Sequence, residues 1–175
     1  MAGDAHFNEV FFDNVQLDED ALIGQEGQGW AQVNAQLAFE RSGPERVYAS
    51  MVLLNAWTEA LRAQDYLTAD AQQVLGGLLA ELSTLRGMSL AMTGQLVAGL
   101  SPAVEAAVVK DYGTEFEQRV IREIGQWLGA HPEFAVSGEL MQALAYLEQM
   151  GVTFSLRGGT REILRGIIAR GLGLR

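Results

Sequence analysis

Arginines gather near the C-terminal end of the sequence, beside a glycine pair that precedes a predicted helix. Residues 157–175 carry a single acid, Glu162, and five arginines: Arg157, Arg161, Arg165, Arg170 and Arg175. Guanidinium groups near a helix end are suited to binding an anionic group such as a phosphate. The alternative is an ordinary solvated helix face, with cations placed favourably near a helix C-terminus.

Other side chains with reactive chemistry are few or scattered. The sequence has no cysteine, which excludes a disulfide scaffold, a thiolate zinc site and a cysteine nucleophile. His6 and His131 have no second histidine or acid pair at ligand spacing, so we expect no metal site. No serine lies in a Gly-x-Ser-x-Gly context, so nothing supports nucleophilic acyl transfer. Trp30, Trp57 and Trp127 are interpreted as core anchors.

The composition is that of an acidic chain with the length of one domain. It has 175 residues, of which 49% are hydrophobic, and a formal net charge of -10. This length predicts one domain with a substantial core. The acidic balance excludes a general nucleic-acid binder, which needs a basic face. No apolar run approaches the ~18 residues of a membrane span, and no basic-then-apolar leader begins the chain, so we expect a cytoplasmic protein.

Helical periodicity dominates the sequence from Trp30 onward. Apolar residues recur at steps of three and four in five segments, at about residues 28–65, 70–99, 101–128, 138–151 and 161–170. Gly43-Pro44 interrupts the first segment and should kink it or tighten a turn within one long rod, because proline removes a backbone donor. Gly99 predicts the end of the second segment, and Ser101-Pro102 predicts the N-cap and first residue of the third. The pattern predicts an all-α fold, an antiparallel four-helix bundle with an extra C-terminal helix.

Residues 7–17 differ from this helical pattern. They are aromatic and β-branched around an Asp13-Asn14 turn signal, which predicts a short strand, and residues 18–29 predict an acidic, glycine-rich loop. A lone strand is not stable by itself, so we interpret it as a β remnant whose neighbouring strands are missing from this chain. The predicted division is the end of a β-domain and a linker at residues 1–27, followed by a helical bundle domain at residues 28–175.

Segments at the two ends of the chain resemble the acyl-CoA dehydrogenase family. Residues 7–15 read FNEVFFDNV and residues 22–30 read LIGQEGQGW, which is similar to the family's last β-domain strand and the turn into its helical domain. Residues 159–170 read GTREILRGIIAR, which resembles the family's closing helix. With the helices between them, these motifs extend the resemblance over the whole chain, but only over the C-terminal half of a usual member.

The resemblance implies an enzyme that oxidises an acyl-CoA thioester to the trans-2-enoyl-CoA with FAD. In this family a glutamate removes the α-proton while the β-hydride passes to the flavin. Most members carry that glutamate directly before the Gly-Thr of the closing motif, where this sequence has Gly158. Other members carry it in a Glu-Arg pair on the first bundle helix, which here is Glu40-Arg41.

The resemblance therefore implies Glu40 as the catalytic base and Arg41 as a structural or substrate-binding neighbour on the CoA side. The alternative is that Glu40 is a solvated helix residue with Glu45 or Arg41 as its local partner.

The same resemblance implies FAD-binding residues in the middle of the chain. Arg62 falls where the family directs an arginine at the FAD pyrophosphate of a neighbouring subunit, and Gln73 matches a glutamine that is also used on FAD. Gln126 and Gly129 resemble part of the family's Gln-x-x-Gly-Gly loop. For Gln73 the alternative is an ordinary surface amide.

Further positions bear on the predicted flavin site, for it or against it. Thr160 and Glu162 fit the closing motif that reaches FAD at a helix N-terminus, where free backbone donors suit an anion; for Thr160 the alternative is an ordinary N-cap. Ala130 replaces the second glycine of the cofactor loop, and Asp65-Tyr66 replaces the family's aromatic-Gly pair.

Two functions stay open at this point. The first is the C-terminal domain of a flavin-dependent acyl-CoA dehydrogenase that uses Glu40 and is inactive as this piece alone. Its implied partners are an acyl-CoA, further subunits in a homodimer, tetramer or heteromer, and an electron-transfer flavoprotein. The second is a catalytically silent partner subunit or assembly module that completes a flavin site on another chain. Gly158, Asp65 and Ala130 favour the second function, whereas Glu40-Arg41 and Arg62 favour the first.

Overall fold

The computed structural model describes residues 8–46 and 48–174, and helices account for most of them. The described α-helices are α1 (Gly29–Ser42), α2 (Met51–Ala63), α3 (Ala69–Val97), α4 (Ala103–Ala130), α5 (Gly138–Met150) and α6 (Arg161–Gly171). No strand occurs in the described residues, so the predicted all-α class is confirmed. None of the helices in this part of the chain is long and apolar enough to cross a membrane.

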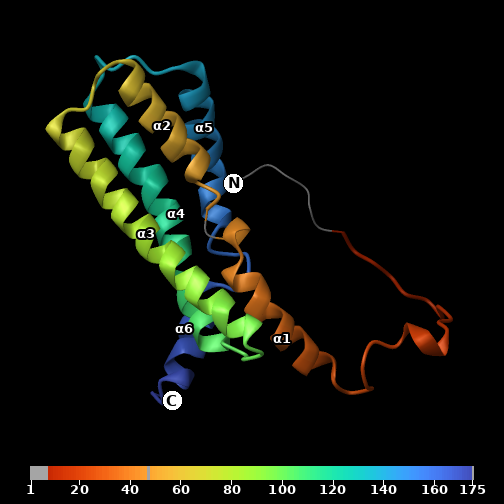
Figure 1. Cartoon of the computed structure of the whole chain (residues 1–175). Coiled ribbons are helices and arrows are strands. Elements are labelled where there is room, and N and C mark those ends of the chain that lie inside the picture. The colour runs from red at the N-terminus through yellow and green to blue at the C-terminus, as the bar shows by residue number, and fades with distance from the viewer. Residues whose placement is uncertain (1–7, 47, 175) are drawn as a thin grey trace.

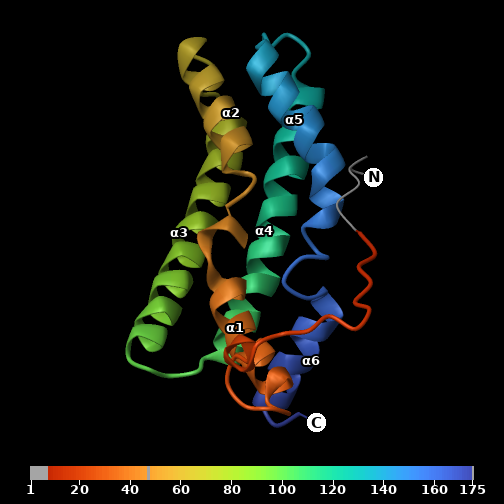
Figure 2. The same cartoon turned by 90° about the vertical axis from the view of Figure 1, so that its right-hand side faces the viewer.

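The bundle is organised around α4 (Figures 1 and 2). The helix α4 contacts each of the other five described helices. It lies antiparallel to α3, while α2 and α5 cover one half of its length and α1 and α6 cover the other half (Figure 1). The predicted antiparallel four-helix bundle with an extra C-terminal helix is therefore confirmed, with α6 as the extra helix.

Large apolar side chains from four helices fill the core. They come mainly from α2, α4 and α5, with Leu78 and Leu85 of α3 beside them. The buried set includes Leu53, Leu54, Trp57, Leu61, Phe116, Val120, Ile124, Trp127, Leu140, Leu144 and Leu147. Trp57 and Trp127 meet edge to face at 5.3 Å between ring centroids, which confirms both as core anchors. Trp30 is 78% exposed, so its interpretation as a core anchor is wrong.

The first helical segment is divided completely at the predicted interruption. Helix α1 ends at Ser42, a single 3₁₀ turn covers Pro44–Arg46, and α2 begins at Met51. Gly43 has an extended conformation, with ψ near 145°, and Pro44 cannot donate a backbone hydrogen bond. The expected long rod is therefore two helices joined by a short irregular segment.

Local glycine and hydroxyl chemistry accounts for three of the helix ends. Gly99 has φ near +77° just after α3, and the hydroxyls of Ser137 and Thr160 accept from backbone N–H groups in the first turns of α5 and α6. At α4 the prediction is wrong by one residue. Pro102 is the N-cap and α4 begins at Ala103, because Pro102 has ψ near 61°, outside the helical range.

The predicted strand at residues 7–17 is wrong for the part that the structure describes. Residues 8–17 form no strand, and Phe7 lies outside the described residues. A strand requires a neighbour for its ladder of backbone hydrogen bonds, and no neighbouring strand is present among the described residues. Residues 8–28 instead run outside the bundle (Figure 1), and the side chains of Phe11, Phe12 and Ile23 are each more than 80% exposed.

Candidate functional site

Glu40 lies in the last turn of α1, immediately before the break between α1 and α2. Its side chain is 32% exposed, and its Oε1 accepts from Arg46 Nη2 at 2.5 Å. It also lines a groove of about 260 Å³ together with Gln32, Val33, Gln36 and Leu37, all from α1. The ion-pair partner of Glu40 is therefore Arg46, which corrects the expectation of Glu45 or Arg41.

Arg41 points away from this groove and into the protein. It is only 6% exposed, and its Nε donates to the carbonyl oxygen of Gly158 at 2.9 Å. Burial lowers the pKa of Arg41, against the opposing effect of Glu40 beside it. These contacts are those of the structural alternative for Arg41; its substrate-binding role stays a prediction.

The hydrogen bond from Arg41 brings together two segments that are far apart in the sequence. One is the Glu40-Arg41 pair on α1, and the other is Gly158, which directly precedes the closing motif. Gly158 and Gly159 have φ near +71° and +105°, values that L side chains rarely adopt. A glutamate at position 158 would therefore be strained in this loop, whereas Glu40 occupies ordinary helical backbone.

The C-terminal arginines bind acids of the same chain. Arg161 Nε donates to Asp111 Oδ1 at 2.7 Å, and Arg165 Nε donates to Asp111 Oδ2 at 3.3 Å. Arg157 binds the buried Glu117. Most of the arginine cluster thus fastens α6 and the preceding loop to α4. This corrects both sequence interpretations, since these three arginines form neither an open anion site nor a merely solvated face.

Thr160 and Glu162 begin the closing helix. The Thr160 hydroxyl accepts from the backbone N–H of Ile163, so Thr160 is an N-cap in this structure. The pKa of the exposed Glu162 is lowered by its own backbone N–H and by the Thr160 hydroxyl. The backbone N–H groups of Glu162 and Ile163 are thus already bonded to side-chain oxygens, and an anion at this helix N-terminus would take the place of those oxygens.

The other predicted flavin residues lie at the opposite end of the bundle. All four are exposed: Arg62 in the last turn of α2, Gln73 early in α3, and Gln126 and Gly129 near the end of α4. Since Arg161 anchors the start of α6 at Asp111, and Gln126 lies fifteen residues farther along α4, the two groups are roughly 20 Å apart. The structure therefore does not bring the six predicted cofactor residues into one site.

Aromatic residues close this far end of the bundle. Asp70 Oδ2 accepts from Trp127 Nε1 at 2.8 Å and lies 3.0 Å from His131 Nε2. The ring of His131 stacks on Trp127, and the Tyr66 hydroxyl donates to Glu133 at 2.5 Å. Tyr66 and His131 thus make structural contacts at this end of the bundle. They lie at, or directly after, the positions where the sequence departs from the family's glycine patterns.

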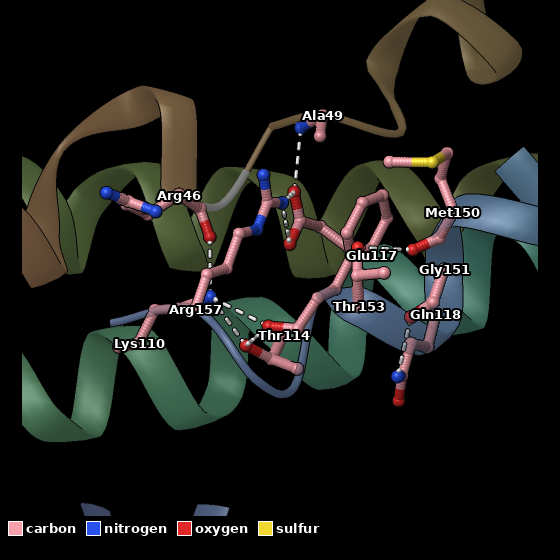
Figure 3. Close-up of polar contacts among 11 residues, drawn as sticks. Arg46, Ala49, Lys110, Thr114, Glu117, Gln118, Met150, Gly151, Thr153 and Arg157 are labelled. Atoms are coloured by element: carbon pink, nitrogen blue, oxygen red, sulfur yellow. Dashed lines mark hydrogen bonds and ion pairs between the residues drawn. The ribbon is translucent and has the colours of Figure 1, made fainter. Parts of the chain in front are cut away.

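A buried polar network on α4 was missed by the sequence analysis (Figure 3). Lys110 and Glu117 are both fully buried. Lys110 Nζ donates to the Arg46 carbonyl oxygen at 3.0 Å and to Thr114 Oγ1 at 2.7 Å. Glu117 accepts from the backbone N–H of Ala49 at 2.8 Å and from Arg157 at 3.1 and 3.2 Å. The spacing of 110, 114 and 117 places all three side chains on one helix face. This spacing is the sequence signal from which the network could have been predicted.

The two buried charges have shifted ionisation. Burial lowers the pKa of Lys110 from 10.5 to about 8, against the attraction of Glu117. Burial also raises the pKa of Glu117, opposed by the Ala49 N–H group and by Arg157.

The shifted pKa of Lys110 predicts a pH dependence of stability. Between pH 8 and 10.5 the unfolded chain binds more protons at Lys110 than the folded protein does, so the free energy of unfolding contributed by this group rises with pH. Relative to that of Lys110→Met, the free energy of unfolding of the wild-type protein should therefore rise by about 3 kcal/mol between pH 8 and 10.5. Urea unfolding of both proteins at several pH values measures the difference, and parallel pH profiles would contradict the prediction.

Comparison with known proteins now assigns the family. The sequence profile "Acyl-CoA dehydrogenase, C-terminal domain" matches residues 27–173. The chain belongs to the acyl-CoA dehydrogenase family. Among the described residues, no three His, Asp or Glu side chains gather closely enough to hold a metal ion.

Similar proteins are acyl-CoA dehydrogenases of mycobacteria. FadE29 of Mycobacterium tuberculosis is 27% identical over 95% of this chain and 45% of its own length. FadE34 of the same organism is 29% identical over 99% of this chain and 24% of its own length. The chain thus spans about half the length of the first relative and about a quarter of the second.

Solved acyl-CoA dehydrogenase structures share the fold. A crystal structure from Mycobacterium smegmatis, assigned to this family, has a TM-score of 0.76 at 23% identity and covers 94% of this chain and 44% of that one. The steroid ACAD Tcur3481-Tcur3483 has a TM-score of 0.71 at 24% identity and covers 93% and 44%. At this level of identity the likeness concerns the fold, and it shows that the helical bundle is one part of a longer protein in these relatives.

Proposed function

We propose that this chain is the C-terminal domain of a flavin-dependent acyl-CoA dehydrogenase that converts an acyl-CoA to the 2-enoyl-CoA. The supporting observation is the hydrogen bond from Arg41 to Gly158, which places Glu40-Arg41 beside the loop before the closing motif. The resemblance gives the catalytic base of the family two alternative places in the sequence, and in this fold those places are neighbours. Glu40 can therefore act as the base at a place where Gly158 has no side chain to do so.

Glu40 acts in this proposal by accepting the α-proton of the bound thioester. An α-proton is weakly acidic, so its removal requires a base held close to the carbon in a site from which water is excluded. The groove beside Glu40 is open in this chain, since Val33 and Phe39 on α1 are more than half exposed. We propose that the remainder of the full-length protein covers this face and completes the dry pocket.

The exposed polar residues of the chain fit FAD. The guanidinium group of Arg62 and the amides of Gln73 and Gln126 are suited to phosphate and to adenine edges, and the first turn of α6 after Thr160 offers backbone donors. When bound, FAD supplies the acceptor for the β-hydride. In the full-length protein these residues would contribute contacts to the cofactor, and Glu40 would remove the proton.

The separation of the two cofactor groups favours an oligomer. The start of α6 and the end of α4 that carries Gln126 are roughly 20 Å apart. We propose that Thr160 and Glu162 contact the flavin beside Glu40, whereas Arg62, Gln73, Gln126 and Gly129 contact the flavin of a neighbouring subunit. The enzyme would then be a homodimer or tetramer in the cytoplasm, passing its electrons to an electron-transfer flavoprotein. The two-part name of Tcur3481-Tcur3483 keeps a heteromer as an alternative.

The isolated chain is expected to bind FAD poorly. It spans 45% of the length of FadE29, and the apolar side chains of residues 10–23 are exposed where a β-domain would cover them. After incubation with FAD and gel filtration, the 175-residue chain should elute colourless and inactive. Full-length protein should carry stoichiometric flavin that is bleached by at least one thioester from a panel of straight and branched acyl-CoAs. Yellow protein from the short chain alone would contradict this prediction.

A second candidate function is a catalytically silent subunit that completes a flavin site on another chain. The observation in its favour is Gly158 at the usual position of the base, together with the ion pair that occupies Glu40. The test uses the full-length protein with its bound flavin. This function would be supported if no thioester of the panel reduces that flavin until a second subunit is added.

A further inference from the structure

The break between α1 and α2 is held by two buried charges on α4. Lys110 Nζ donates to the carbonyl oxygen of Arg46, at the start of the segment that leads to α2. Glu117 accepts from the backbone N–H of Ala49, three residues farther on. Both side chains are fully buried and lie on the same face of α4 (Figure 3).

Buried charges are unfavourable unless they are paired and hydrogen-bonded, and apolar residues of similar size are often at least as stabilising. Here the hydrogen bonds of Lys110 and Glu117 reach main-chain atoms of the segment between α1 and α2. Lys110 Nζ also lies 3.5 Å from the Phe154 carbonyl oxygen, and Arg157, which binds Glu117, directly precedes Gly158 in the loop before α6. The network therefore fixes the break and the closing loop against the same helix.

Arg46 connects this network to Glu40. Its carbonyl oxygen is held by Lys110, while its Nη2 donates to Glu40 Oε1 at 2.5 Å. The side chains of Arg46 and Glu40 are 25% and 32% exposed, so the pair lies at the edge of the protein, next to the groove of α1. A main-chain anchor behind an arginine limits the positions that its guanidinium group can take.

We propose that Arg46 is a positioning residue that orients the Glu40 carboxylate for proton abstraction, and that Lys110 holds Arg46 in place through its carbonyl oxygen. This inference rests on the proposed function, because it needs Glu40 as the base. It assigns the buried lysine a task in the site, although Lys110 itself does not touch the substrate.

The test compares variants of the full-length flavoprotein with the panel thioester that reduces the wild-type flavin fastest. Arg46→Gln should lower kcat and α-proton exchange in deuterium oxide by about 10- to 100-fold, while KM stays within about twofold. Arg46→Lys should recover part of the loss, because it restores the positive charge beside the Glu40 carboxylate. Lys110→Met, which keeps the side-chain volume, should lower kcat in the same direction without changing KM.

Arg119→Gln is the matched control, because Arg119 forms a partly exposed ion pair with Glu81 between α4 and α3. It should leave kcat unchanged. An equal loss of kcat in Arg119→Gln, or a kcat for Arg46→Gln within twofold of wild type, would overturn the positioning role.

Glu40→Gln in the same assays separates the two failures. If Glu40→Gln is inactive while Arg46→Gln is fully active, only the positioning proposal is wrong. If Glu40→Gln keeps its activity, or if no thioester reduces the wild-type flavin, the base assignment fails and the positioning proposal fails with it.

Discussion

Glu40→Gln is expected to lower flavin reduction by acyl-CoA about 10²- to 10⁴-fold in the full-length protein, which is the usual contribution of a general base. Glutamine has almost the same shape as glutamate and still accepts a hydrogen bond from Arg46, but it cannot take up the α-proton. Exchange of that proton with deuterium oxide should be lost together with flavin reduction. Binding of the thioester should change little, because the carboxylate is proposed to act on the proton.

Glu45→Gln is the matched control for this experiment. Glu45 carries the same charge, lies in the 3₁₀ turn five residues after Glu40, and is exposed. It should keep near-normal reduction and exchange. Equal activity of Glu40→Gln and Glu45→Gln would remove Glu40 from the mechanism. No residue beside the closing loop would then be assigned as the base.

Glu117→Ala is expected to lower the free energy of unfolding by about 3–5 kcal/mol, the usual cost of removing one partner from a buried ion pair. The substitution leaves Arg157 and the charge of Lys110 without their acid, and the Ala49 N–H group loses its acceptor. Glu81→Ala removes a partner from an ion pair whose arginine is 39% exposed, and it should cost no more than about 1 kcal/mol.

Urea unfolding measures both changes under the same conditions. Similar losses for Glu117→Ala and Glu81→Ala would show that the network on α4 is not an unusually important anchor. In that case the break between α1 and α2 would be held mainly by packing around Leu53, Leu54 and Trp57.

Most of the fold was predictable because helical periodicity is a local signal. The apolar spacing of α3 and α4 predicted both long helices, and Gly43-Pro44 predicted an interruption of the first segment, although not its division into two helices. The strand was not predictable in the same way. Its residue types are typical of strands, but strand formation depends on a neighbour that the described part of the chain does not contain.

The site was only partly predictable for a related reason. Family resemblance pointed to Glu40 and Arg41, but the contact from Arg41 to Gly158 depends on how α1 packs against the closing loop. The spacing of Lys110, Thr114 and Glu117 was visible in the sequence. Nothing local showed that these polar residues face inward toward the break, because their partners are main-chain atoms of distant segments.

A crystal structure of the full-length flavoprotein with a non-reactive acyl-CoA analogue tests the central claim most directly. The position of the Glu40 carboxylate relative to the α-carbon of the analogue is the decisive measurement. We expect a separation of about 3–3.5 Å, the range of a near-attack arrangement. A carboxylate that points into solvent, with another acid beside the α-carbon, would contradict the account.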